Sequence, residues 1–545
     1  MKRHCVHLLS LCLFFFTFIV PHARAAGDVE LGEVNAQVAE VLKTVVEHGA
    51  DALHDMGIQA DPKAVATAVQ TLGAVIIKYL LGGNKLTKEW LSPEVDTAFG
   101  NFFPADTKTT QLDKATQIIL GGLQWKSPYT ALAADTAIFG GGFLGILSYT
   151  FVIKKMEKLN GFAKTVLVNA PLITGALPRL PLGWYANRAD GGVLSLRVAT
   201  GLAAAGLAAI AVLSHFTDIE TIEGAGDPLY WAWLGAGLLI GAGISTYSPG
   251  VINAKNWFLK EQAGVAQGIF GGLGNMLPAV LAATLAHVIS GLGYTWTYAL
   301  WTGVLGVFAL VTFPFLATPP AQVAGRAALA TGLKLPAANF WTTAGKALIS
   351  PDKWIYSYLY LASFGAFISM PNILGFYNSD PHYTPTPYAL ESTHLGYIIA
   401  GYIFVSSLTR SLSGILVDKI GGPIVAISGL LVGTLGTVPL ALHARPFDGD
   451  HVGSSIAWWS GLAGMGLGWG AAMAATFGWI AQKTPAAEFG ITGGMAGAIG
   501  ACGFINSWLA YYMGGWSSTA ISGTAVLAAA GLASYQRWYR PAETH

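Results

Sequence analysis

Charged residues are scarce in this chain, and cysteine is scarcer still. Only 11% of its 545 residues are Asp, Glu, Lys or Arg, whereas soluble domains carry roughly 25%. The three cysteines, Cys5, Cys12 and Cys502, stand in apolar stretches, which excludes both a disulfide framework and a spaced metal-binding cluster. The formal net charge is +1 and no basic run occurs, so the sequence offers no electrostatic surface for nucleic acid.

Catalytic patterns are missing from the sequence as well. It contains no nucleophile placed beside a base, no phosphate-binding loop and no set of metal ligands with a known spacing. We therefore predict neither an enzyme nor a bound cofactor or metal.

Long apolar segments dominate the chain instead. Apolar residues make up 53%, glycine occurs 68 times, and the mean hydropathy is +0.51. Segments of about 20 residues, the length that crosses a bilayer, lie near 131–153, 165–186, 192–214, 229–249, 264–289, 291–316, 355–377, 394–417, 422–443, 455–481, 488–513 and 516–535. This predicts an all-α membrane protein with 12 transmembrane helices: a six-helix bundle (131–316), a central inner loop (317–354) and a second six-helix bundle (355–535).

The N-terminal 130 residues differ from the rest. Residues 1–25 combine a basic start, an apolar run and a small-x-small site, which is typical of a signal peptide or an uncleaved signal anchor. Residues 26–130 mix acidic and apolar residues at a helical period, which predicts a helical N-terminal extension. Within it, residues 64–81 favour a packed amphipathic helix over a membrane span. A cleaved signal would place residue 26 outside and require one more crossing, so the side of the extension stays open.

Lysine and arginine are distributed unevenly between the connections. The central loop, the tail (536–545) and most connections on their side are basic, whereas the opposite connections are acidic or uncharged. Positive residues favour the inner side of a membrane. We therefore predict a multi-pass protein of the cell (inner or plasma) membrane with both ends of the repeat inside, although the lysine-rich connection at 154–164 disagrees.

Each predicted bundle contains one deep arginine that opens the same pattern. The pattern is Arg-x-x-x-Gly, then a polar residue followed by a cation, and then paired glycines. It occurs at 179–192 and at 410–422, with one inserted residue in the first copy. A guanidinium at this depth costs about 2.5–3.5 kcal/mol. Because Arg179 and Arg410 lack an evident neutralising carboxylate in the spans, we predict that they hold an anion between the two bundles. The competing interpretation is a snorkelling side chain or a bond to backbone carbonyls.

Few other titratable groups fall within the spans. Asp135 is expected to be a charge at the end of the first helix, and His215 and His287 are expected to be helix-end histidines. None of the three is a strong candidate for binding a proton by sequence alone.

Two glycine runs occupy matching positions in the halves. The fifth span has Gly264, Gly268, Gly271, Gly272 and Gly274, directly followed by Asn275, and the eleventh has Gly490, Gly493, Gly494, Gly497, Gly500 and Gly503. Glycines three or four apart let another backbone approach closely. Such dense runs predict either contact with a small ligand or helices that slide past one another.

Taken together, these segments resemble the nitrate/nitrite porter family of the major facilitator superfamily. The resemblance covers about 131–535 but not the N-terminal region. It rests on the Arg179-Leu-Pro-Leu-Gly segment, Trp257-Phe258 with the glycine run that follows, Tyr360-Leu-Ala-Ser-Phe-Gly, Leu408-Thr-Arg, and Gly493-Gly-Met-Ala-Gly-Ala-Ile-Gly. The resemblance implies the major facilitator fold, in which the substrate lies between the halves.

The resemblance also implies roles for individual residues. Arg179 and Arg410 would hold the planar anion from opposite sides, Asn275 would donate a hydrogen bond, and Tyr360 and Phe364 would wall the pocket. The glycines Gly271, Gly272, Gly274, Gly497 and Gly500 would lie where helices slide past the site. Asn187, Arg188, Asp418 and Lys419 would form gating turns on the inner side; Asn187 departs from the family, which usually has an acid there.

A guanidinium suits nitrate or nitrite because it presents several donors in one plane and stays charged. The predicted function is a monomeric secondary transporter for nitrate and/or nitrite, working by exchange or by symport with H+. A porter for small carboxylates such as oxalate or formate, and an anion transceptor or sensor that signals through the extension, are the alternatives.

Overall fold

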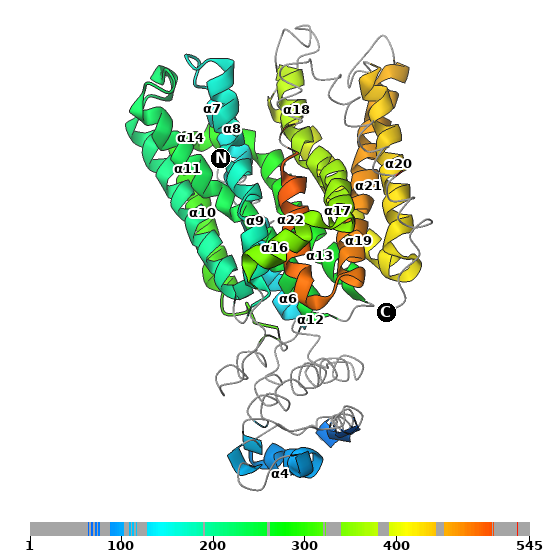
Figure 1. The fold of residues 1–545 in the computed structure, drawn as a ribbon. Helices are drawn as coiled ribbons and strands as arrows, with labels where there is room; N and C mark the ends of the chain where they lie inside the picture. Colours follow the sequence, from blue (N-terminus) through cyan, green and yellow to red (C-terminus); the bar gives the residue numbers. More distant parts are fainter. Residues whose placement is uncertain are drawn as a thin grey trace.

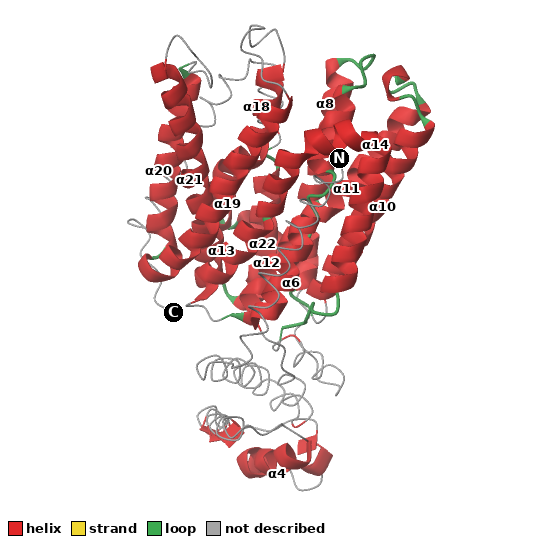
Figure 2. Ribbon diagram, turned by 180° about the vertical axis from the view of Figure 1, so that it is seen from behind, coloured by secondary structure: helices red, strands yellow, loops and turns green. Residues whose placement is uncertain are grey.

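The computed structural model describes residues 88–102 and most of 128–505, with gaps at 189–190, 259–261, 320–338, 380–391 and 443–451, together with isolated positions elsewhere. The predicted leader (1–25), most of the extension, the twelfth span (516–535) and the tail (536–545) lie outside the described residues. Every regular element within the described ranges is helical. Figures 1 and 2 show the two sets of helices standing side by side in one bundle.

Most predicted spans of the first half consist of two shorter helices in place of one continuous helix. The elements are α6 (Pro128–Gly141), α7 (Ile146–Lys154), α8 (Gly161–Ala176), α9 (Arg179–Ala186), α10 (Gly191–Phe216), α11 (Pro228–Ser245), α12 (Tyr247–Trp257), α13 (Ala263–Gly274) and α14 (Met276–Thr312). Thus the first, second, fourth and fifth predicted spans each consist of two helices in series. The fifth and sixth spans are joined in α14 across a kink at Gly293, whose φ is 71°.

Proline explains two of these breaks. A proline ring clashes with the carbonyl group four residues earlier and lacks the amide hydrogen that would bond to it. Pro249 lies four residues after Ser245, where α11 ends, and Pro278 lies four residues after Gly274, where α13 ends. The residues that follow these ends, including Tyr247 and Asn275, are therefore held at interruptions inside the bundle, where both are buried.

The second half includes three helices of 20 residues or more, α19 (Ser392–Ile420), α20 (Gly422–Ala441) and α21 (Val452–Lys483). Its other elements are α16 (Phe340–Ile349), α17 (Pro351–Tyr360), η4 (Leu361–Gly365), α18 (Ala366–Ser379) and α22 (Ala486–Ala501). The seventh span runs through α17, η4 and α18, and η4 is a π-helical turn that contains Phe364. Such turns interrupt helices and are frequent at functional sites.

Within the part of the chain that the structure describes, five helical stretches are long and apolar enough to cross a bilayer: 191–216, 228–257, 263–312, 394–420 and 422–440. Large apolar side chains also face outward, among them Phe216 (79% exposed) and Leu310 (78% exposed). An apolar exterior of this kind is what a lipid solvent requires, whereas water would select the opposite arrangement.

The halves meet closely at one end of the bundle, which we call the inner end in keeping with the lysine and arginine bias. There α9 packs on α22, where Gly183 lies against Gly490 and Gly494, and α13 packs on α19, where Gly264 and Gly414 lie backbone to backbone. A Cβ at any of these positions would collide with the opposite backbone. The glycines therefore permit the closed contact between the halves.

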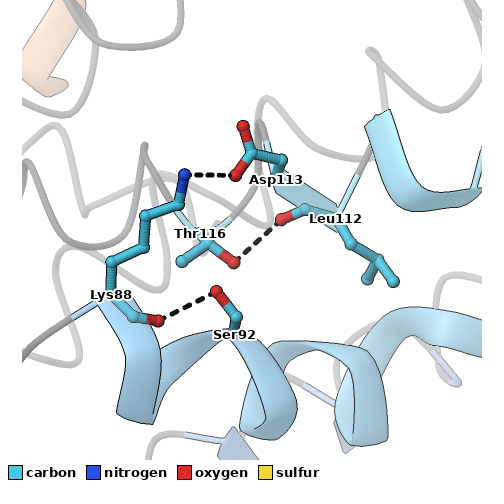
Figure 3. A network of polar contacts seen from close by, with 5 residues as sticks. All are labelled: Lys88, Ser92, Leu112, Asp113 and Thr116. Carbon is cyan, nitrogen blue, oxygen red and sulfur yellow. Dashed lines mark hydrogen bonds and ion pairs between the residues drawn. The ribbon is translucent and has the colours of Figure 1, made fainter.

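Helix α4 (Lys88–Phe99) of the N-terminal extension lies beyond the inner end, at which α6 begins (Figure 1). Lys88 Nζ forms a 2.6 Å ion pair with Asp113, and the neighbouring hydroxyls of Ser92 and Thr116 donate to the carbonyl oxygens of Lys88 and Leu112 (Figure 3). A second ion pair joins Lys108 to Asp96 at 2.8 Å. The described part of the extension thus has tertiary contacts of its own.

Candidate functional site

Arg179 is the first residue of α9 and is completely buried. One terminal nitrogen donates to the carbonyl oxygen of Gly497 at 2.9 Å, and the other donates to the carbonyl oxygen of Ile244 at 3.3 Å. Its Nε–H has no hydrogen-bond partner. The bonds to carbonyls agree with the competing interpretation made from the sequence, but carbonyl oxygens are neutral and leave the positive charge of Arg179 uncompensated.

Arg410 lies in the middle of α19 and is also completely buried. It donates a 2.6 Å hydrogen bond to the hydroxyl of Tyr247 and contacts the sulfur of Met473 at 3.7 Å. Its Nε–H is likewise unpaired. No carboxylate forms an ion pair with either arginine among the residues that the structure describes.

Tyr247 connects the two arginines. The guanidinium carbon of Arg179 lies 4.9 Å from the centre of its ring, and that of Arg410 lies 5.5 Å from the same centre. Both distances fall in the range of cation–π attraction. The two cations therefore converge on one buried aromatic ring at the junction of α11 and α12, and neither points into lipid.

Tyr360 and Phe364 form the aromatic wall beside this ring. Their rings are parallel within 5° and 4.9 Å apart, because residues four apart share one face of the seventh span. Both are stacked with Tyr247, at 6.0 Å and 6.2 Å, and the ring of Phe477 meets Tyr360 and Tyr247 edge-on. The guanidinium carbon of Arg179 also lies 5.4 Å from the Phe364 ring centre.

Two buried polar groups lack good hydrogen bonds: the hydroxyl of Tyr360, beside Tyr247, and the amide of Asn275, at the break between α13 and α14. The hydroxyl of Tyr360 interacts with Tyr247 and Arg410 but makes no hydrogen bond of good geometry. Asn275 is 1% exposed, and both polar atoms of its amide are unpaired. A buried amide without a partner costs about 1–3 kcal/mol. Such groups are available to a polar ligand.

The sliding glycines predicted from the sequence lie against residues of this region. Gly271 faces the guanidinium of Arg410, Gly497 faces the side chain of Arg179, and Gly500 faces the ring of Tyr360. The two remaining ones, Gly272 and Gly274, lie against Ser411 and Phe139. At Gly271 and Gly500 a Cβ would overlap the opposing side chain, so an absent side chain is what makes room for the arginine and the tyrosine.

The two predicted gating turns differ from each other. The carboxylate of Asp418 accepts hydrogen bonds from the backbone amides of Gly264 and Val265, at 2.8 and 2.7 Å, and caps the N-terminus of α13. In the first half the corresponding residue is Asn187, whose Cβ lies against Gly490 of α22. Arg188 lies over the ring of Trp184 at 3.8 Å, and Lys419 is exposed in the last turn of α19.

Sequence reasoning missed Tyr247 and was wrong about Asp135. Tyr247 stands two residues before Pro249, and the break that this proline causes was the only available signal.

Asp135 was expected to be a charge at a helix end. It instead lies in the interior of α6 and is 0% exposed, because the helices α12, α13 and α14 pack around it. His287 is bonded to the hydroxyl of Tyr397 at 2.9 Å.

Comparison with known proteins identifies the family. A sequence profile of the Major Facilitator Superfamily matches residues 224–507, which is more than half of the chain. The chain belongs to the Major Facilitator Superfamily. It resembles the structure of the superfamily's proton:xylose symporter XylE bound to 6-bromo-6-deoxy-D-glucose, with a TM-score of 0.54 and 15% identity over 75% of this chain and 96% of that one.

These matches confirm the predicted all-α major facilitator fold, which is that of a multi-pass membrane protein of a transporter superfamily. The predicted count of 12 transmembrane helices extends beyond the described residues and stays a prediction. The sequence is also similar to named transporters. This chain is 25% identical over 345 residues to the probable nitrate/nitrite transporter NarK2 of Mycobacterium tuberculosis, and the match covers 63% of this chain and 78% of NarK2. It is 27% identical over 249 residues to the nitrite extrusion protein of Bacillus subtilis, covering 46% of this chain and 54% of that one. A probable nitrate transporter NarT of Staphylococcus haemolyticus is 26% identical over 212 residues, which are 38% of this chain and 49% of NarT.

Proposed function

We propose that this protein is a secondary transporter that moves nitrate and/or nitrite across the cell membrane by alternating access. The observation that carries the proposal is the convergence of Arg179 and Arg410, one from each half, on the ring of Tyr247 without a carboxylate partner among the described residues. The matched relatives, which are named as nitrate/nitrite transporters or nitrite extrusion proteins, support the same substrate class.

The chemistry of the surroundings favours a small planar anion. Three nearly parallel rings, those of Tyr247, Tyr360 and Phe364, line the region with flat apolar faces. The unpaired Nε–H groups of both arginines and the unpaired amide of Asn275 supply hydrogen-bond donors. A planar oxyanion can accept in-plane hydrogen bonds from a guanidinium while its faces stack on aromatic rings.

The charge of the region also favours exchange. An empty site leaves two permanent cations close to the same ring, and their repulsion is strong because the surroundings exclude water. A bound anion attracts both cations and so lowers the free energy of the state in which the halves close around it. Return of the empty carrier is then slow, and the protein exchanges one anion for another more readily than it returns unloaded.

Purified protein in detergent provides the first test. Nitrate and nitrite should raise its melting temperature, whereas chloride at the same concentration should have little effect. Arg179→Lys and Arg410→Lys should each abolish the shift, because lysine keeps the charge but loses the planar fork. Arg197→Lys is the matched control, since Arg197 lies on α10 and donates only to the carbonyl of Phe313 among the contacts described.

Vesicles provide the second test. Uptake of labelled nitrate should be faster into vesicles preloaded with nitrite than into empty ones, and equal rates would contradict exchange. A larger melting shift with formate or oxalate than with nitrate would instead identify a porter for small carboxylates. Removal of residues 26–127 should leave the nitrate flux intact if the protein is a carrier, whereas loss of a signalling output with anion binding intact would identify a sensor that signals through the extension.

A further inference from the structure

Asp135 is a buried carboxyl group that the proposed anion site does not use. It lies in the middle of α6 and is 0% exposed. Neither of its oxygens makes a hydrogen bond of good geometry to any described residue. The amide of Asn253, on α12, lies beside it, and both polar atoms of that amide are also buried and lack well-formed hydrogen bonds.

No cation neutralises this carboxyl group within the described part of the chain. On the helices packed against α6, Lys255 of α12 lies over the ring of Phe489 at 4.7 Å, Arg197 of α10 donates to the carbonyl of Phe313, and His287 of α14 bonds to Tyr397. Helix α13 carries no ionisable side chain, and the Tyr247 hydroxyl at the start of α12 is engaged by Arg410.

An ionised carboxylate in such surroundings would have lost its hydration without gaining a counter-ion or a hydrogen bond, which is strongly unfavourable. The neutral acid avoids most of this penalty. We propose that Asp135, with Asn253 beside it, is a proton-binding site, and that the conformation described here holds the protonated acid. The proposal of proton coupling that follows rests on the proposed anion transport.

The position of Asp135 links it to the anion site. Phe139 follows it by four residues, one turn further along α6, and the ring of Phe139 lies 5.2 Å from that of Tyr247. Asn253 follows Tyr247 by six residues along α12, in the direction of the inner end. The carboxyl group is therefore about one helical turn from the aromatic cluster, on its inner side.

Proton binding and anion binding would then favour each other. An ionised Asp135 would place a negative charge near the two arginines and weaken their attraction for an anion, whereas the neutral acid leaves that attraction intact. By linkage, the bound anion favours the protonated acid to the same extent. When the inner ends separate, water reaches the carboxyl group, the O–H bond breaks, and the proton leaves to water as Asp135 becomes a carboxylate. One proton would thus move with the anion.

Infrared spectroscopy on the purified protein tests the proton site without any transport measurement. At a pH where exposed carboxyl groups are ionised, the wild-type protein should show the carbonyl stretch of a protonated carboxylic acid. Asp135→Asn, which replaces the acid by a side chain of the same shape, should lose this band. Asp218→Asn is the matched control, because Asp218 is in an exposed connection, and it should keep the band. A wild-type protein without the band overturns the proposal, and so does a band that survives in Asp135→Asn.

Vesicle uptake tests the coupling. Acid outside should drive net nitrate accumulation by the wild-type protein, at a lower rate than exchange because each cycle ends with the slow return of the unloaded carrier. Asp135→Asn should lose at least nine-tenths of that accumulation, a loss of about ten-fold or more. Unchanged acid-driven accumulation in Asp135→Asn overturns the coupling. If the wild-type protein shows the infrared band but exchanges no nitrate or nitrite, the transport proposal fails and the proton site stands. If it exchanges the anions but shows no band, the proton site fails and the transport proposal stands.

Discussion

Arg410, from the second half of the chain, donates a 2.6 Å hydrogen bond to the hydroxyl of Tyr247, from the first half. The two residues are 163 positions apart in the sequence. This bond satisfies one donor of a buried guanidinium with a neutral oxygen, which leaves the charge uncompensated. The hydroxyl therefore occupies a donor that an anion entering the region would use.

The first prediction concerns this bond. Tyr247→Phe keeps the stacked ring but removes the acceptor, and a hydrogen bond to a charged group contributes about 1.5–3 kcal/mol. The anion-free protein should melt at a lower temperature, and nitrate should stabilise it by more than it stabilises the wild type, because the anion then satisfies an unpaired donor. Tyr185→Phe, at a half-exposed position of α9, is the control. An unchanged nitrate shift would show that the hydroxyl and the anion do not share Arg410.

The second prediction concerns the glycine at the guanidinium. Gly271→Ala places a methyl group against the Arg410 side chain, and overpacking of a tight interior costs about 1–3 kcal/mol. We expect roughly a ten-fold or greater loss of nitrate affinity, measured by the concentration that gives the half-maximal melting shift. Gly303→Ala, in α14, meets no heavy atom within 4 Å and should leave the affinity unchanged. Equal effects of the two substitutions would refute a specific role of Gly271.

The third prediction concerns the closed inner end. Asp418→Asn removes the negative charge that caps α13, and a charge at a helix N-terminus contributes about 0.3–1 kcal/mol, up to about 2 in buried positions. The inner ends should therefore separate more often, so that a thiol introduced by Ala186→Cys, at the buried end of α9, reacts several-fold faster. The reaction should be unaffected by Asp218→Asn. A rate no faster in Asp418→Asn than in the parent would contradict a gating role.

The fourth prediction concerns the aromatic wall. Tyr360→Ala removes one of three parallel rings and opens space beside Gly500. The melting shift with nitrate should shrink, and the shift with the larger oxalate anion should grow relative to it. Tyr356→Ala is the comparison, because Tyr356 is buried one turn earlier on α17 against Trp479. If both variants change the two anions in the same proportion, Tyr360 does not shape the preference for a small anion.

Local patterns predicted much of the fold. Segments of about 20 apolar residues set the order of the helices, since the thickness of the bilayer alone requires that length. The same patterns did not show that several spans are interrupted. The break between α13 and α14 could have been placed from Pro278, four residues after Gly274, by the clash that proline causes. The π-helical turn at Phe364 has no comparable local signal, because it depends on how the seventh span packs against its neighbours.

The candidate site was predictable in part for a related reason. A charge in an apolar segment is conspicuous in the sequence, and this selected Arg179 and Arg410. Tyr247 is one of 20 tyrosines, and nothing in its local sequence distinguishes it except the nearby proline. Asp135 stands seven residues from the start of α6, a distance equally compatible with an exposed helix end and with the interior.

The sequence by itself determined that the chain is a helical membrane protein with two related halves and one deep arginine in each, because segment length and the cost of an intramembrane charge are local properties. Only the tertiary structure decided that the two guanidiniums meet at one ring and that the carboxyl group of Asp135 is fully buried without an ion-pair partner among the described residues. Those facts depend on the packing of helices whose residues lie far apart in the chain, and packing fixes which charges face one another.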